Sequence, residues 1–171
     1  RFGHMWRLAR YEEGIELRLR GANGSILFDT ECSAFAVIGT SELPYSSWDA
    51  ENEGLEAVLG KALPAPGVSQ MPSPLMEKRN GDHVIHYDII GLIYWMFARI
   101  EEIGRKDLDA HDRFPATSSH AYKHGYLERP IIDEWFHVLG QVIQRQWPSL
   151  VLKNHSFDVK VSHDVDRPSR S

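Results

Sequence analysis

Cysteine and long apolar runs are both scarce in this sequence. Cys32 is the one cysteine among 171 residues, which excludes a disulfide within the chain and fits a reducing compartment. We interpret Cys32 as a buried structural thiol. The most apolar run, residues 89–100, is shorter than the roughly 20 residues that a membrane helix needs, so no membrane span is predicted. Because no signal peptide is recognisable, we expect a cytoplasmic protein.

An excess of positive charge is also missing. The chain has 19 Lys and Arg against 24 Asp and Glu, for a formal net charge of −5. Nucleic-acid sites need clustered Lys and Arg, so we expect no nucleic-acid partner. The sequence has neither a glycine-rich phosphate loop nor a Gly-x-Ser-x-Gly elbow. P-loop nucleotide binding and α/β-hydrolase chemistry are therefore not predicted.

Apolar residues are abundant enough for one folded domain. Hydrophobic residues make up 42% of the chain, with five Trp, six Tyr and seven Phe, which supports a sizeable core at this length. Residues 1–5 include Gly-His-Met and resemble a cloning scar of vector origin, so we expect the native sequence to begin near Trp6. The domain is predicted to extend over residues 6–156.

The start of the domain is predicted to be β. Residues 5–11, 14–20 and 25–28 are short runs with strand character, separated by glycine-containing segments. Asn23 and Gly24 tolerate positive φ, which predicts a hairpin turn between the second and third runs.

The middle of the chain is less regular. Residues 49–61 predict a short helix, with Leu55, Val58 and Leu59 as its apolar stripe. Four prolines between residues 63 and 81 exclude a helix interior and a central strand alike. This segment is either a linker or a long surface loop that closes over something, and we favour the loop.

Two main helices are predicted in the second half. Asp88 is a candidate N-cap for a helix over residues 88–103, which is apolar nearly all round and therefore expected to be central and buried. Pro130 suits the first turn of a helix over residues 130–147, where its missing N–H costs nothing. Together with the N-terminal hairpin, they predict an α/β or α+β fold. A small mixed or antiparallel sheet would be covered by the two helices.

His120 and His124 have a spacing that lets two imidazoles on a helix bind one metal ion. Gly125 directly follows them, however, so the segment has room for only about one helical turn. No third ligand lies next to them in the sequence. We therefore favour the interpretation that both are polar surface histidines. Tyr45 and Trp48, in a loop rich in Pro and Ser, could stack on a sugar ring, although packing is the favoured role.

The last residues carry the clearest chemical pattern. Residues 157–162 alternate apolar and polar side chains, which predicts a strand. Asp164 and Asp166 follow and would project from the same face. Two adjacent carboxylates suit a metal ligand paired with a general base. A metal site needs about three protein ligands, so this segment supplies only part of one.

Residues 162–168, Ser-His-Asp-Val-Asp-Arg-Pro, resemble the opening motif of the polysaccharide (chitin-type) deacetylase superfamily. Upstream, the segments 88–102, 112–119 and 125–133 resemble the uncharacterised domain that precedes the catalytic barrel in some bacterial deacetylase-like proteins. The resemblance covers about residue 82 to the end. It implies that residues 157–171 are the first strand and motif of a truncated catalytic domain.

The resemblance also implies roles for the two aspartates. Asp164 would be the general base of the full-length enzyme, and Asp166 would ligate a divalent metal, with zinc the expected ion. The superfamily's His-x-x-x-His pair follows its aspartates, whereas His120 and His124 precede them. We therefore do not transfer the metal role to these histidines, and we expect no cofactor in the present fragment.

Two functional interpretations stay open. In the first, the chain is the non-catalytic N-terminal accessory domain of a metal-dependent polysaccharide deacetylase, and it docks on, shapes or gates its own downstream catalytic barrel. A polysaccharide would be a second partner. In the second, the chain is a stand-alone glycan- or protein-binding module without hydrolase activity. The sequence downstream discriminates between them, because a His-x-x-x-His unit there would favour the first.

Overall fold

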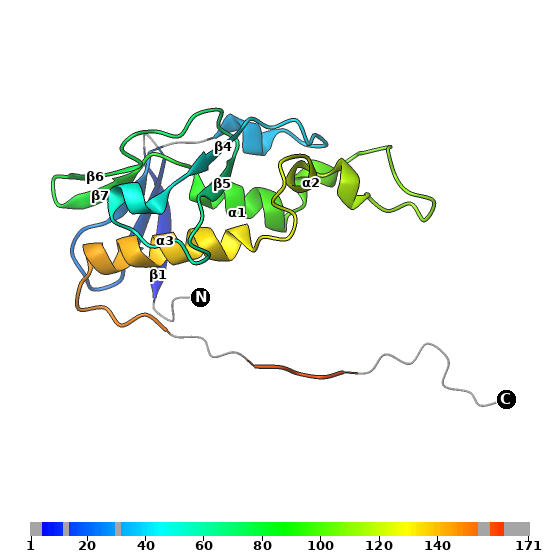
Figure 1. Ribbon diagram of the computed structural model, residues 1–171. Helices are drawn as coiled ribbons and strands as arrows, with labels where there is room; N and C mark the ends of the chain where they lie inside the picture. Colours follow the sequence, from blue (N-terminus) through cyan, green and yellow to red (C-terminus); the bar gives the residue numbers. More distant parts are fainter. Residues whose placement is uncertain (1–4, 12–13, 30–31, 154–157, 163–171) are drawn as a thin grey trace.

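Five strands form the main sheet of the computed structural model, which describes residues 5–11, 14–29, 32–153 and 158–162 (Figure 1). Their spatial order is β1-β2-β3-β7-β6. β3 and β7 pair in parallel, and the other neighbours are antiparallel. The strands are β1 Trp6–Tyr11, β2 Gly14–Leu19, β3 Ile26–Phe28, β6 Met76–Arg79 and β7 Asp82–Ile85. The predicted N-terminal hairpin and mixed sheet are confirmed.

A second, two-stranded sheet pairs β4 (Tyr45–Trp48) with β5 (Leu63–Pro66). The prolines excluded only a central strand, and β5 has a free edge because its sheet has two strands. The loop interpretation of residues 63–81 is nevertheless wrong for residues 63–66. In an antiparallel ladder, successive residues point their backbone groups to opposite sides. The carbonyls of Pro64 and Pro66 accept hydrogen bonds from Trp135 Nε1 and Tyr87 Oη, both at 2.8 Å. Both prolines therefore face away from β4, where a missing N–H costs nothing.

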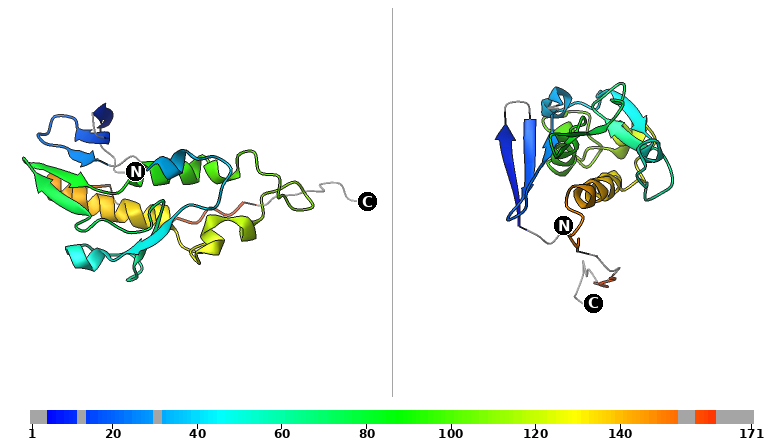
Figure 2. Two further views of the ribbon diagram at one scale, coloured as in Figure 1. Left: turned by 90° about the horizontal axis from the view of Figure 1, so that it is seen from above. Right: turned by 90° about the vertical axis from the view of Figure 1, so that its left-hand side faces the viewer.

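Within the described residues, three α-helices and four short 3₁₀ turns complete the fold. The α-helices are α1 Ile89–Phe97, α2 His120–Lys123 and α3 Ile131–Gln146, and the 3₁₀ turns are η1 Ser33–Ala36, η2 Ala50–Glu53, η3 Ile100–Glu102 and η4 Ala116–Ser118. α3 contacts β7, β5 and α1, and Figure 2 shows it running along the main sheet with the β4–β5 ribbon on its other side. The chain therefore has a mixed α+β fold with two main helices.

The predicted helix over residues 88–103 is shorter in the structure. Asp88 is its N-cap and accepts a hydrogen bond from Gly91 N at 2.7 Å, as expected. The helix stops at Phe97, because Arg99 takes a left-handed conformation (φ 51°) and η3 follows. Gly39 N donates to the carbonyl of Ile100 at 3.0 Å, so a tertiary contact uses the backbone where the helix would have continued.

Two further boundaries differ from the sequence prediction. Residues 49–61 form only η2, which ends at Gly54 in a left-handed conformation (φ 65°) that glycine adopts without strain. Leu55 is buried as predicted, but Val58 and Leu59 are 53% and 45% exposed. Pro130 stands at the N-cap of α3 rather than in its first turn.

The core is continuous across both sheets and both main helices. Trp135 on α3 lies at its centre with no exposed surface. Its indole stacks on Trp48 of β4, with ring centroids 5.5 Å apart, and packs at a tilt against Tyr87, with centroids 4.8 Å apart. At the far end of α3, Trp147 packs against Trp6 of β1 at 5.8 Å. Aromatic contacts from α3 therefore join the two sheets.

The segment after α3 departs from the strand prediction. Residues 158–162 have no strand pairing in the structure, and residue 157 lies outside the described residues. Val159 and Val161 are 63% and 80% exposed. A strand needs a neighbouring strand to pair its backbone N–H and C=O groups, and the segment pairs with none in the described part. Among the described residues, no helix is long and apolar enough to cross a membrane.

Candidate functional site

Asp164 and Asp166, the site residues expected from the sequence, lie outside the described residues. Their roles as general base and metal ligand stay predictions. The described part of the chain contains no group of three or more His, Cys, Asp or Glu side chains placed to hold a metal ion. The described residues by themselves therefore do not fit a metal centre, and we derive no chemical step through a metal.

His120 is fully buried, so its interpretation as a surface residue is wrong, whereas His124 is exposed. The helix α2 starts at His120, with Ser119 capping the Tyr122 N–H. The Nε2 atom of His120 lies 3.1 Å from the carbonyl oxygen of Leu43, which can only accept, so Nε2 carries the proton. Nδ1, 2.5 Å from Tyr126 Oη, is then the acceptor.

Burial, together with the nearby His124, lowers the pKa of His120 to about 4. Burial also raises the pKa of the Tyr126 hydroxyl. The two histidine rings are 4.3 Å apart, and His124 stacks on Tyr45 at 4.4 Å. Because both nitrogens of His120 already have protein partners, this cluster cannot bind a metal through His120. We therefore interpret His120 and His124 as a structural pair. Tyr45 is packed between His124 and Tyr126.

A second polar pair lies where the two parallel strands end. Asp29 follows β3 and His86 follows β7, and Asp29 Oδ2 is 2.7 Å from His86 Nδ1. On the other side of the ring, His86 Nε2 is 3.7 Å from Glu77 Oε1. The sequence reasoning missed this pair, although a polar residue directly after each of two strands is a visible signal. Both ring nitrogens face a carboxylate, so we interpret the pair as a tie between β3, β7 and β6.

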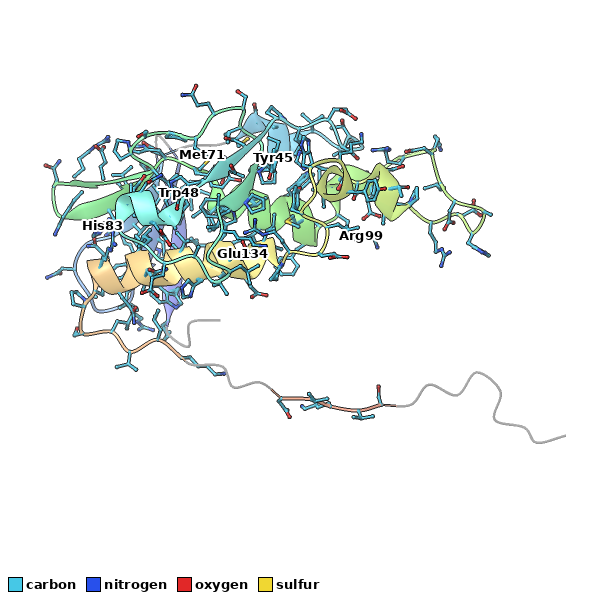
Figure 3. All side chains as sticks on the ribbon, viewed as in Figure 1. Tyr45, Trp48, Met71, His83, Arg99 and Glu134 are labelled. Carbon is cyan, nitrogen blue, oxygen red and sulfur yellow. The ribbon has the colours of Figure 1, made fainter. Side chains whose placement is uncertain are left out.

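A polar groove of about 510 Å³ lies beside the β4–β5 ribbon. We call it the polar groove and define it by its lining residues: Ser47, Trp48, Asp49, Asn52, Glu53, Ala62, Met71, Pro72, Ser73 and Pro74. Trp48 and Met71 mark its position in Figure 3. None of the described residues that line it is a Lys, Arg or His. The sequence reasoning noted Trp48 but could not foresee that residues 71–74 would lie opposite it.

Apolar side chains are exposed on α1 and at the start of α3. Tyr94 and Phe97 are 62% and 71% exposed, contrary to the expectation that this helix is buried all round. A groove of about 460 Å³ lies next to Phe97 and is lined mainly by apolar residues of both helices, among them Ile132 and Phe136. We define the apolar face by five residues: Tyr94, Met96, Phe97, Ile132 and Phe136. Exposed apolar patches of this kind mark interaction surfaces.

Comparison with known proteins adds a family but no function. Residues 22–148 match a family of unknown function (DUF7033). No curated protein and no solved structure matches the chain. The matched range contains the polar groove and the apolar face, and it excludes β1, β2 and residues 158–162.

Proposed function

Because this chain belongs to the DUF7033 family, whose function is unknown, we propose a role from its own residues: it is the non-catalytic N-terminal accessory domain of a metal-dependent polysaccharide deacetylase. The domain packs on the catalytic barrel that follows it in the same polypeptide. The barrel carries out the hydrolysis, and Asp164 and Asp166 contribute the general base and one ligand of a divalent metal such as zinc.

The observation that carries this proposal is the unpaired segment 158–162. Val159 and Val161 alternate with polar residues as in a strand, yet both are exposed, and the segment pairs with no strand among the described residues. Strand-patterned valines without a partner sheet suggest that other polypeptide covers them. The segment leads directly into the deacetylase-like motif at residues 162–168. A first barrel strand whose neighbours lie in the following domain accounts for both features.

The apolar face supports docking rather than catalysis. Tyr94 and Phe97 project large apolar side chains into solvent, while the core continues on the opposite side of α1 through Leu92 and Trp95. A tethered neighbour has an effective concentration in the millimolar range, so even a modest apolar contact is occupied. We assign the catalytic barrel of the same polypeptide to this face. A cytoplasmic location stays a prediction.

Acetate release from acetylated oligosaccharides, with added Zn²⁺ or Co²⁺, tests the proposal. We expect no turnover by the 171-residue chain, because Asp164 and Asp166 supply at most two groups of a site that needs about three ligands and a base. We expect turnover by the polypeptide extended through the downstream coding region, and its loss in the Asp166→Ala variant. Turnover by the 171-residue chain that Asp166→Ala abolishes would contradict the accessory role.

The stand-alone binding module remains the second candidate, and the polar groove is the observation that favours it. Its hydroxyl, amide and carboxylate groups suit a hydroxyl-rich ligand. The coding sequence after Ser171 separates the two candidates. A strand–helix unit that carries His-x-x-x-His supports the accessory domain, and a stop codon supports the module.

A further inference from the structure

We propose that the polar groove binds a neutral oligosaccharide. The inference rests on the proposed function only in the choice of an N-acetylated sugar as the probe, since the groove's chemistry is read from its own residues. If the proposed function holds, the groove presents polysaccharide to the neighbouring barrel.

The two walls of the groove are held together by Glu53. Its Oε1 and Oε2 atoms accept hydrogen bonds from the backbone N–H groups of Leu75 at 2.5 Å and Met76 at 3.0 Å. The η2 wall is itself anchored to α3, because Arg145 donates to the carbonyl oxygens of Glu53 and Gly54. The spacing between residues 47–53 and 71–74 is therefore set before any ligand arrives, which lowers the entropy cost of binding.

The groove retains polar groups that the fold does not use. The side chains of Ser47, Asn52 and Ser73 make no hydrogen bond within the described part of the chain. Asp49 Oδ1 accepts the N–H of Glu51 at 3.0 Å to cap η2, which leaves its second oxygen available. Hydroxyls and an amide offer both donors and acceptors, whereas a carboxylate only accepts. This mixture matches sugar hydroxyls, which also donate and accept.

The charge and shape of the groove narrow the ligand class. The described lining has two carboxylates and no cationic side chain, so the groove disfavours an anionic ligand. Both oxygens of Glu53 already accept backbone N–H hydrogen bonds, and Asp49 is exposed, so the attraction for a cation is weak. Met71 and Pro72 add an apolar surface for a sugar ring. A volume of about 510 Å³ lies within the range of small-molecule sites.

Backbone chemical shifts of the 171-residue chain, titrated with tri-N-acetylchitotriose, test the inference. We expect shifts confined to residues 47–53 and 71–76. The Asn52→Ala, Ser73→Ala double variant should bind about tenfold more weakly, because each lost neutral hydrogen bond weakens binding about three- to tenfold. Both residues are exposed, so the variant should fold. Ser69→Ala, an exposed serine of the same loop outside the groove, is the matched control and should bind as the wild type.

Four results would overturn the inference: no shifts at about 20 mM sugar, shifts centred elsewhere, equal affinity in the double variant, or tighter binding of either charged comparison sugar. The comparison sugars are the same trimer without its acetyl groups, which is cationic when its free amines are protonated, and trigalacturonic acid, which is anionic. Acetate release by the extended polypeptide is measured separately. Failure of that assay with groove binding intact rejects the deacetylase role alone, and the reverse result rejects the groove alone.

Discussion

Acidification should destabilise the folded chain through His120. The ring is buried and neutral, with Nε2 donating to the Leu43 carbonyl and Nδ1 accepting from Tyr126 Oη. An imidazolium would carry a second N–H and a charge in a buried site. The unfolded chain pays neither cost and takes up a proton near pH 6.5. The unfolded state therefore gains protons first as the pH falls.

The magnitude follows from the two pKa values of His120. Burial lowers the pKa from 6.5 to about 4 in the folded state. At 1.36 kcal/mol for each tenfold change, this gap corresponds to about 3 kcal/mol. The sign is that of a depressed base: the contribution is fully present above pH 6.5 and is lost progressively as the pH falls to about 4. A loss of this size is a large fraction of the 5–15 kcal/mol typical of folded domains.

Urea melts followed by tryptophan fluorescence between pH 7.5 and 4.5 measure the effect. The free energy of unfolding of wild type should fall towards that of His120→Gln as the pH falls, because the variant lacks the titrating ring. His137→Gln, an exposed histidine on α3, is the matched control, and the convergence must be smaller there. If the difference between wild type and His120→Gln stays constant over this range, the assigned neutral state of His120 is wrong.

Three other predictions concern the core, the apolar face and the metal. Trp135→Ala should lower the free energy of unfolding measured in a urea melt by about 3–5 kcal/mol, because the indole is fully buried and donates to the Pro64 carbonyl. The control Gln144→Ala, at an exposed position on the same helix, should change it by less than about 0.5 kcal/mol. If Trp135→Ala were as stable as the wild type, α3 would not be part of the core. Phe97→Ser should change the stability of the 171-residue chain by less than about 0.5 kcal/mol, since the ring is 71% exposed. In the extended polypeptide, the same variant should be cleaved faster between the domains by limited proteolysis. An unchanged rate of cleavage would argue against docking at this face. Calorimetric titration with Zn²⁺ should show no site tighter than about 1 μM, and a tighter site that Asp166→Asn abolishes would show that the fragment already contains a complete metal centre.

Elements with strong local patterns could be predicted from the sequence alone. β2 follows apolar–polar alternation, and the structure has both β1 and β2 within one residue of the predicted ends. α3 follows from apolar residues at helical spacing, bounded by Pro130 and Pro148. Asp88 could be assigned as an N-cap because a short carboxylate before an apolar run is a local signal. In each case the relevant interactions join residues close in the chain.

Elements that depend on distant partners could not be predicted. β5 is a strand because its two prolines face Trp135 and Tyr87 rather than β4, and only the packed structure reveals that direction. The polar groove has walls separated by about twenty residues of chain, and Glu53 joins them through backbone N–H groups that carry no sequence signal. The prediction that His120 lies on the surface failed because its hydrogen-bond partner, the Leu43 carbonyl, is also distant in the chain.

The exposed valines 159 and 161 and the apolar face on α1 show what the sequence determines and what the tertiary structure determines. Alternation and helical spacing determine which face of an element is apolar, because side-chain direction follows from backbone geometry. They do not determine what covers that face, because burial depends on which other element packs there. The sequence by itself determined the hairpin, the cap at Asp88 and the long helix α3. Tertiary structure alone decided that α1 ends at Phe97, that His120 is buried and that residues 47–53 meet residues 71–74, because each of these depends on contacts between residues far apart in the chain.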